Sequence, residues 1–246
     1  MKNKFNLLLF TTVSVLFSSS LLAEGFNDNY LQLGYTSSDY KHVDKITTVS
    51  GSVEFGNNYL LSGSYSYEKG DWNDPGEYET LTTKKTLIGV DKYFPLNSTT
   101  DITSSLTFDK WKLTKTCTLT AGTDCSDSYS DGKVSYIDVS TASIGIKNLT
   151  ASGIEISLKN SWGRLRATSN YYYYNPSIGI RHISESGLES SAEYSKISEF
   201  GSNPIQSRLE IGLIKHINKN FAIGGRFLSV KEPDWTENGI FVRRSF

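Results

Sequence analysis

Residue types that commonly carry out acid–base or nucleophilic chemistry are few in this sequence and lie far apart. The three histidines are His42, His182 and His216, and His42 lies in the polar segment Lys41-His42-Val43-Asp44. An isolated histidine in such a segment is far more often a solvated side chain than a catalyst. Neither G-x-S-x-G nor H-E-x-x-H occurs. We therefore expect no catalytic residue, no cofactor and no metal site.

The two cysteines, Cys117 and Cys125, are close in sequence, and the threonine-rich segment around them is polar. A metal site would need further thiols or nearby histidines, and the histidines are distant in sequence. An exported chain meets an oxidising compartment, so we expect one local disulfide between Cys117 and Cys125. The loop it closes is short, so the bond stabilises the fold modestly and mainly rigidifies a hairpin.

Residues 1–23 have the layout of a cleaved signal peptide. Lys2 and Lys4 precede an apolar core that runs to Phe17, and small residues follow up to Ala23. The core is too short and too interrupted by Thr and Ser to span a membrane. We expect cleavage after Ala23, export from the cytoplasm and a single mature domain over residues 24–246.

The mature chain carries 23 basic and 26 acidic residues, and its basic residues are scattered along the sequence. Nucleic-acid binding needs a clustered positive surface, so the sequence argues against that class of partner. The mean hydropathy is −0.34. A sliding average conceals segments whose alternate residues face lipid and water, because the two faces cancel.

From Asn29 onward apolar and polar residues alternate, and helical spacing is absent, which predicts an all-β chain. One class of segment ends in a cation or aromatic, as in Ile88-x-Val90-x-Lys92-x-Phe94, and a tight turn follows. The other class begins apolar and ends aromatic, and longer polar connections follow it at 38–45, 70–80, 114–132, 199–203 and 231–238. The classes alternate strictly, which predicts a single antiparallel transmembrane β-barrel of about twelve strands, with ten as the alternative because the register near 133–147 is ambiguous.

The last residues repeat the first pattern, as Ile240-x-Val242-x-Arg244-x-Phe246. With the signal peptide and the hairpin periodicity, this closing strand resembles that of the small bacterial outer-membrane β-barrel proteins. The resemblance implies location in the outer membrane, contact with the lipid bilayer and lipopolysaccharide, and recognition of Phe246 by the barrel assembly machinery. It leaves the oligomeric state open. A secreted β-sandwich also alternates, but it would not place aromatics at opposite ends of successive strands.

If residues such as Leu61, Ile156, Leu209 and Val242 face lipid, the charged residues that alternate with them must face the lumen, because a charge costs several kcal/mol in hydrocarbon. The expected lumen-lining residues are Glu54, Glu68, Glu155, Lys159, Arg208, Glu210, Arg226 and Arg243. We expect the three arginines to lie together on one wall and Glu54, Glu68 and Glu155 on other parts of it. Such a lumen is either a wetted pore or a plug closed by its own ion pairs.

The leading functional hypothesis is therefore a porin-like passive channel for small hydrophilic solutes. The alternative is a non-conducting barrel that acts through its loops, in adhesion or in stabilising the cell envelope. The lengths of the polar connections favour neither hypothesis.

Overall fold

The structure is a computed structural model that describes residues 29–40, 43–74, 77–119, 134–199 and 204–246. The proposed signal peptide lies outside the described residues, and so do His42 and Cys125. Among the described residues, no helix is long and apolar enough to cross a membrane.

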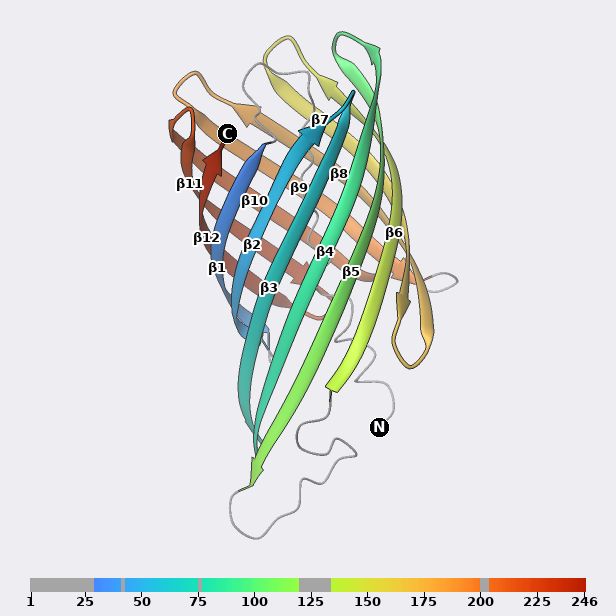
Figure 1. Cartoon of the computed structure of the whole chain (residues 1–246), viewed down its shortest axis with the longest axis vertical. Helices are drawn as coiled ribbons and strands as arrows, with labels where there is room; N and C mark the ends of the chain where they lie inside the picture. Colours follow the sequence, from blue (N-terminus) through green and yellow to red (C-terminus); the bar gives the residue numbers. More distant parts are fainter. Residues whose placement is uncertain (1–28, 41–42, 75–76, 120–133, 200–203) are drawn as a thin grey trace.

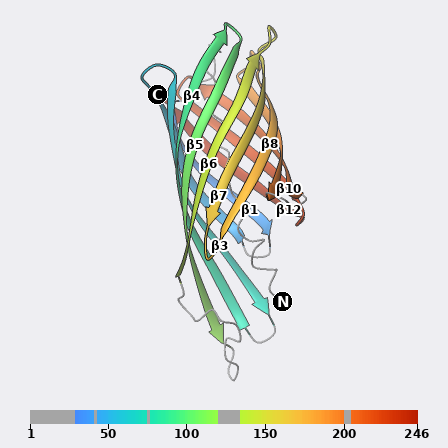
Figure 2. The same cartoon turned by 90° about the vertical axis from the view of Figure 1, so that its right-hand side faces the viewer.

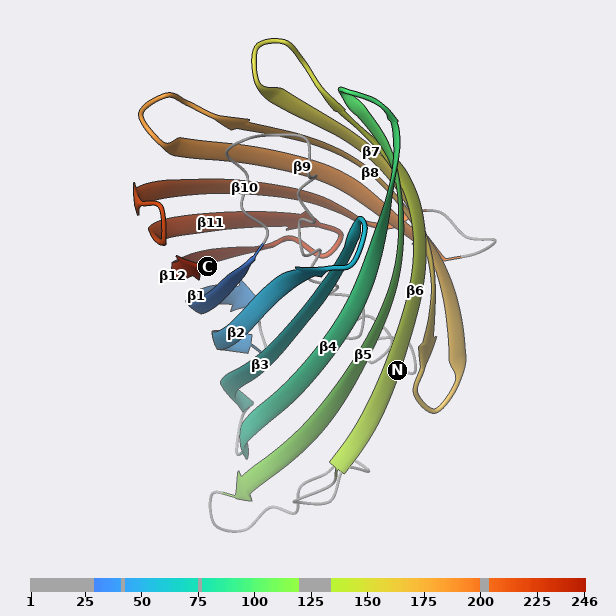
Figure 3. The ribbon, with the colours of Figure 1, turned by 45° about the horizontal axis from the view of Figure 1, so that its top comes forward.

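The described chain folds into antiparallel strands that close into one barrel, in which each strand pairs with its sequence neighbours and β1 pairs with β12 (Figures 1 and 3). The twelve strands are β1 (Tyr30–Tyr40), β2 (Val43–Phe55), β3 (Tyr59–Asp74), β4 (Glu77–Asn97), β5 (Thr100–Leu119), β6 (Val134–Leu149), β7 (Ile154–Arg166), β8 (Asn170–Ile183), β9 (Leu188–Glu199), β10 (Pro204–Asn218), β11 (Phe221–Lys231) and β12 (Trp235–Ser245). The predicted fold class and strand number are confirmed. The segment near 133–147, whose register the sequence left ambiguous, lies in the continuous strand β6, which pairs with β5 and β7 without a register shift.

Tight turns join the strands at the upper end of the barrel in Figure 1, where the chain also ends. The turn between β2 and β3 needs two residues with positive φ, and Gly56 and Asn58 supply them. Gly153 and Gly187 play the same part in two other turns. Short turns on one side are typical of the periplasmic end of an outer-membrane barrel.

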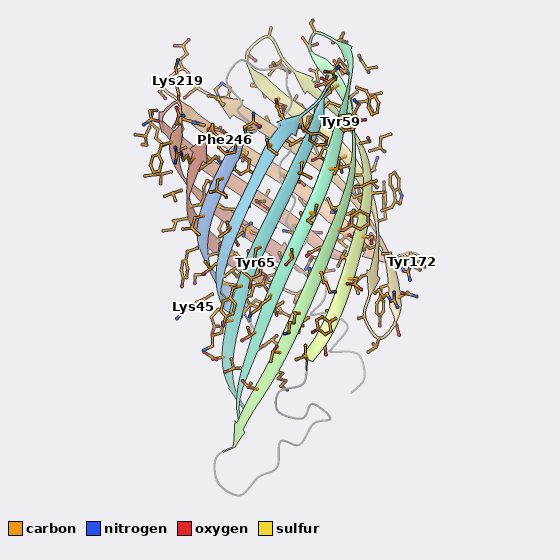
Figure 4. The ribbon with its side chains drawn as sticks, in the orientation of Figure 1. Lys45, Tyr59, Tyr65, Tyr172, Lys219 and Phe246 are labelled. Atoms are coloured by element: carbon orange, nitrogen blue, oxygen red, sulfur yellow. The ribbon has the colours of Figure 1, made fainter. Side chains whose placement is uncertain are left out.

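The outer surface of the wall is apolar over its middle, as a barrel surrounded by lipid requires. Leu61, Ile156, Leu209 and Val242 each expose 40 or 41% of their surface on this side. Exposed aromatic side chains flank the belt, including Tyr59 toward the turns and Tyr65 and Tyr172 toward the other end (Figure 4). Lys92 lies over the Tyr59 ring at 3.8 Å and donates a hydrogen bond to the carbonyl of Asn57 at 2.8 Å, so its charge reaches the polar boundary.

The strands extend further from the turns than the sequence predicts. Most residues of the expected connections at 38–45 and 70–80 belong to strands. In the first, β1 runs to Tyr40 and β2 begins at Val43. In the second, β3 and β4 pair as far as Asp74 and Glu77. These outer segments include residue types that favour strands, among them Tyr40, Val43, Trp72, Tyr78 and Thr80. As a result β3, β4 and β5 project beyond their neighbours at the lower end of Figures 1 and 2.

The outer part of the barrel interior contains an apolar cluster that the sequence analysis missed. Trp111, Ile137, Val139, Leu165, Tyr173 and Ile197 are all buried there, on strands β5 to β9. A second, smaller cluster of Leu228, Val230 and Trp235 packs against Tyr40 on the opposite wall. The interior is therefore polar over part of its length and apolar near the outer end.

Tyr173 of β8 packs against its backbone partner Gly163 of β7. Its ring lies over Gly163, and a Cβ atom added at Gly163 would come within 2.0 Å of the ring. The ring is buried, and its hydroxyl is hydrogen-bonded to Thr141. Only glycine leaves room for the ring at this position.

We expect Gly163→Ala to lower the free energy of unfolding by about 1–3 kcal/mol, the usual cost of overpacking a filled interior. Urea titration in detergent micelles, followed by heat-modifiable migration on a gel, measures this. Gly34→Ala is the matched control, because its added Cβ would meet nothing nearer than 3.4 Å. Equal unfolding midpoints for the two variants would contradict the packing argument.

The barrel closes at the seam between β1 and β12, where Tyr30 lies opposite Ser245 and Ser38 opposite Glu237. Side chains reinforce the backbone pairing. Arg243 donates a hydrogen bond to Gln32 at 3.0 Å, and Thr236 donates one to Asp39 at 2.8 Å. The seam is therefore joined near both of its ends.

Candidate functional site

The barrel encloses a cavity of about 160 Å³ that is partly open to solvent. Strands β1 to β5 and β8 to β12 contribute to its lining, whereas β6 and β7 do not. The cavity follows β12 from Arg243 to Glu237. Six residues of extended chain separate these two, a span of about 20 Å along the strand. The cavity is therefore long and lies against one side of the barrel.

Small residues leave this space open. At inward-facing positions the lining has Gly34 and Thr36 on β1, Ser64 and Ser66 on β3, and Gly212 on β10. The same strands carry large apolar residues on their outward face, because strand side chains alternate between the two faces. The hydrophilic lining follows from this alternation.

The predicted lumen-lining residues divide into two groups. Glu68, Glu210, Arg226 and Arg243 line the cavity. The other four lie outside the cavity lining. Glu155 and Arg208 are buried on the inner face of the barrel, and Glu54 and Lys159 are partly buried at inward positions. Glu155 approaches Lys147 at 3.9 Å, toward the turn end of β6 and β7.

The three predicted arginines occupy the neighbouring strands β10, β11 and β12 but are staggered along them. Arg226 pairs with Gly212, which is four residues from Arg208, and Arg243 pairs with Ala222, which is four residues from Arg226. Four residues of strand span about 13 Å. The arginines therefore form a ladder along the wall, whereas the sequence analysis expected a cluster.

Opposite charges pair locally within the lumen. Lys85 contacts Glu68 at 2.6 Å, Arg226 contacts Glu237 at 2.9 Å, and Arg181 contacts Glu189 at 2.8 Å. Glu54, Glu68 and Glu155 lie on β2, β3 and β7, apart from the three arginines as expected. Other carboxylates pair with cations on adjacent strands, because each buried charge lowers its desolvation cost by contact with a partner.

Several charged lining residues were not among the predicted ones, namely Lys85, Asp109, Arg181, Glu189 and Glu237. The alternation of inward and outward positions already indicated that these residues face the lumen. Arg181 lies between the outward Ile180 and His182, and Glu237 has the same parity as Arg243. Phe241 also lines the cavity, with the Arg243 guanidinium 5.6 Å from its ring centre. The alternation places Phe241 inward, because it lies between the outward Ile240 and Val242, although most aromatics of this chain were expected to face lipid.

The histidines do not form a recognisable catalytic group among the described residues. His216 points inward near the turn between β10 and β11, and its Nε2 lies 3.1 Å from Glu189, which also binds Arg181. His182 lies one residue after Arg181 on β8, and its side chain is partly buried. No group of His, Cys, Asp and Glu suited to a metal ion occurs in the described parts of the chain.

The predicted disulfide lies partly outside the described residues. Cys117 belongs to β5, with its backbone opposite Glu79 of β4, whereas Cys125 falls within 120–133. The pairing of the two thiols stays a prediction.

No protein-family model matches the chain, and no curated protein matches it in sequence. Solved structures match it in fold. The KdgM porin in complex with disordered oligogalacturonate has a TM-score of 0.62 at 12% identity, covering 88% of this chain and 99% of that one. The NanC porin gives 0.60 at 10% identity, with 88% and 98% covered. The transport unit of the autotransporter AIDA-I from Escherichia coli gives 0.58 at 14% identity, with 98% and 97% covered.

Similarity to solved structures at identities this low shows a shared fold and does not show a shared activity. The similar structures include both porins and autotransporter barrels, so one architecture serves different tasks. The chain is a closed antiparallel barrel with the fold of outer-membrane β-barrel proteins.

Proposed function

We propose that this protein is a passive channel of the bacterial outer membrane for small hydrophilic solutes. The observation that carries the proposal is the long cavity lined by glycine, hydroxyl and charged side chains. Charged and hydroxyl groups can replace part of the hydration of a polar solute as it passes. The apolar outer belt and the fold shared with porins support location in that membrane.

Selectivity between ions should be weak. The cavity lining has five carboxylates, from Glu68, Asp109, Glu189, Glu210 and Glu237, and four cations, from Lys85, Arg181, Arg226 and Arg243. Most of these charges are paired with a neighbour of opposite sign. Paired charges of nearly equal number produce little net field along the path.

A non-conducting barrel is the second candidate, and the two apolar clusters near the outer end favour it. They lie on the inner face of strands β5 to β9 and of β11 and β12. A path to the outside must therefore pass between them. If the two clusters contact each other when the protein is in the membrane, they close this path. The barrel then conducts nothing, and the protein acts through its outer segments.

The remaining features of the proposal come from the sequence. We infer export by cleavage of residues 1–23 and assembly that reads Phe246, whose side chain is exposed at the end of the chain (Figure 4). We also infer that Cys117 and Cys125 join the outer end of β5 to the segment that follows.

Single-channel recording in planar bilayers tests the channel directly. We expect discrete conductance steps and a reversal potential near zero in a salt gradient, because the lining charges nearly balance. Refolded protein that shows heat-modifiable migration but no conductance steps would exclude the channel and leave the non-conducting barrel. A large reversal potential would instead contradict the weak selectivity.

A further inference from the structure

Four lysines form a continuous row on the outward face of β2 to β5. Lys45 lies directly opposite Lys69, and Lys84 lies directly opposite Lys112. Lys69 is opposite Thr82, so Lys84 is its diagonal neighbour. Diagonal neighbours on one face of a sheet are about 7–8 Å apart. Lys45, Lys69, Lys84 and Lys112 are therefore one surface, called here the lysine row.

The lysine row lies at the outer boundary of the apolar belt. On β4, Lys84 is eight residues from Lys92, which marks the boundary at the turn end. Eight residues of a strand tilted by about 40° rise about 20 Å, close to the height of a barrel's apolar band. Tyr65 and Tyr67 are exposed just below the row on β3. The row is thus level with the head groups of the outer leaflet, and Figure 4 shows Lys45 projecting from the wall there.

Like charges directly opposite each other on a sheet are destabilising, and the row contains two such pairs. Of the four, Lys69 forms an ion pair with Asp71 at 3.0 Å, and Lys112 has Asp138 of β6 as a diagonal neighbour without an ion pair between them. No ion pair joins Lys45, Lys84 or Lys112 to an acid among the described residues. All four side chains are exposed, so their charges can reach a ligand in the membrane.

Directly opposed lysines are particular to this side of the barrel. On β12 the corresponding outward residues are Thr236 and Asn238, and on β1 they are Ser37 and Asp39. The outer ends of β7, β9 and β11 also carry outward cations, but in the described pairings none of these lies opposite another cation, namely Arg164, Arg166, Lys196 and Lys231. Opposed lysines concentrate positive charge, which matches a partner with more than one negative group.

We propose that the lysine row binds the phosphate groups of an outer-leaflet glycolipid of the lipid A type. Its ammonium groups would donate charge-assisted hydrogen bonds to phosphate oxygens and relieve the repulsion between the opposed lysines. The acyl chains would lie along the apolar wall below, against Tyr65, Tyr67 and Phe108, which are all exposed. The inference holds for a conducting and for a non-conducting barrel alike.

The test uses the folded full chain in detergent micelles, titrated with diphosphorylated lipid A. We expect Lys84→Gln with Lys112→Gln to weaken binding by about 10-fold or more, since each lost lysine removes charge-assisted hydrogen bonds. The matched control is Lys196→Gln with Lys231→Gln, which removes two exposed outward cations from β9 and β11. The control should bind lipid A as the parent does. Equal weakening in both variants, or in neither, would overturn the proposal.

Unfolding in urea gives a second, independent measurement. Without lipid, the Lys84→Gln, Lys112→Gln variant should be at least as stable as the parent, because repulsion is removed. Lipid A should raise the unfolding midpoint of the parent and the control more than that of this variant. Equal protection of the parent by dephosphorylated lipid A would exclude phosphate recognition. Equal protection by inorganic phosphate at the same concentration would overturn the assignment to a lipid.

Discussion

Ser64→Trp is expected to reduce single-channel conductance to below about half of the parent value, because conduction depends on the pore diameter. Ser64 points into the cavity from the middle of β3, between Ser50 of β2 and Leu87 of β4. An indole ring at this position would fill space that glycine and serine side chains now leave open. Planar-bilayer recording at fixed voltage measures the change.

The matched control is Tyr65→Trp, which changes the adjacent residue on the outward face of the same strand. It should leave the conductance unchanged, since the ring stays in the lipid. Both variants should keep heat-modifiable migration, which shows that the barrel is folded. An unaltered conductance in folded Ser64→Trp would mean that solutes do not pass this part of β3.

Lys85→Met is expected to lower the free energy of unfolding by about 3–5 kcal/mol, because it leaves a buried carboxylate without its partner. The Lys85 and Glu68 side chains are only 9% and 5% exposed, and 2.6 Å separates their charged atoms. Lys85 also lies 4.7 Å from the centre of the Trp111 ring, so it connects the charged part of the lumen with the apolar cluster. Urea titration in micelles measures the loss.

Two further variants separate charge pairing from simple packing. Glu68→Gln with Lys85→Met should recover most of the loss, because residue 68 then no longer carries an unpaired buried charge. Lys231→Met breaks the contact with Asp234, in which both side chains are more than two-thirds exposed, and should change stability by less than about 1 kcal/mol. If the double variant is as unstable as Lys85→Met alone, the pairing of Lys85 with Glu68 is not the cause.

The alternation of apolar and polar residues was enough to predict the barrel, its strand number and the direction in which side chains such as Leu61 and Val242 point. Lipid imposes this pattern on every strand, so each strand reports it independently. Lumen positions follow from the same parity. Partners do not, because they depend on register: Glu68 faces Thr83 directly and reaches Lys85 diagonally.

The apolar clusters show where the pattern changes its meaning. On β5, Leu106 and Phe108 face lipid, but two residues further the same face carries Lys110 and Lys112, and Trp111 turns inward. Outside the membrane the surroundings are water, so the inward face becomes the apolar one. The strand continues without a break, and the polarity of its two faces reverses. From the sequence we expected a polar connection at 114–132, whereas β5 runs to Leu119. The reversed polarity of the outer segments therefore concealed both the cluster and the extension.

The seam between β1 and β12 also bears on how slowly the barrel must form. Gln32 and Arg243, which meet across it, are 211 residues apart in sequence. Joining ends this distant costs about 3 kcal/mol more in chain entropy than closing a loop of about 10 residues. The ten other strands can pair as successive hairpins first, so closure is expected to be the late and slow step. Until then the edges of β1 and β12 remain open to other chains. A helper protein that shields these edges until they pair with each other would speed folding without altering the final structure.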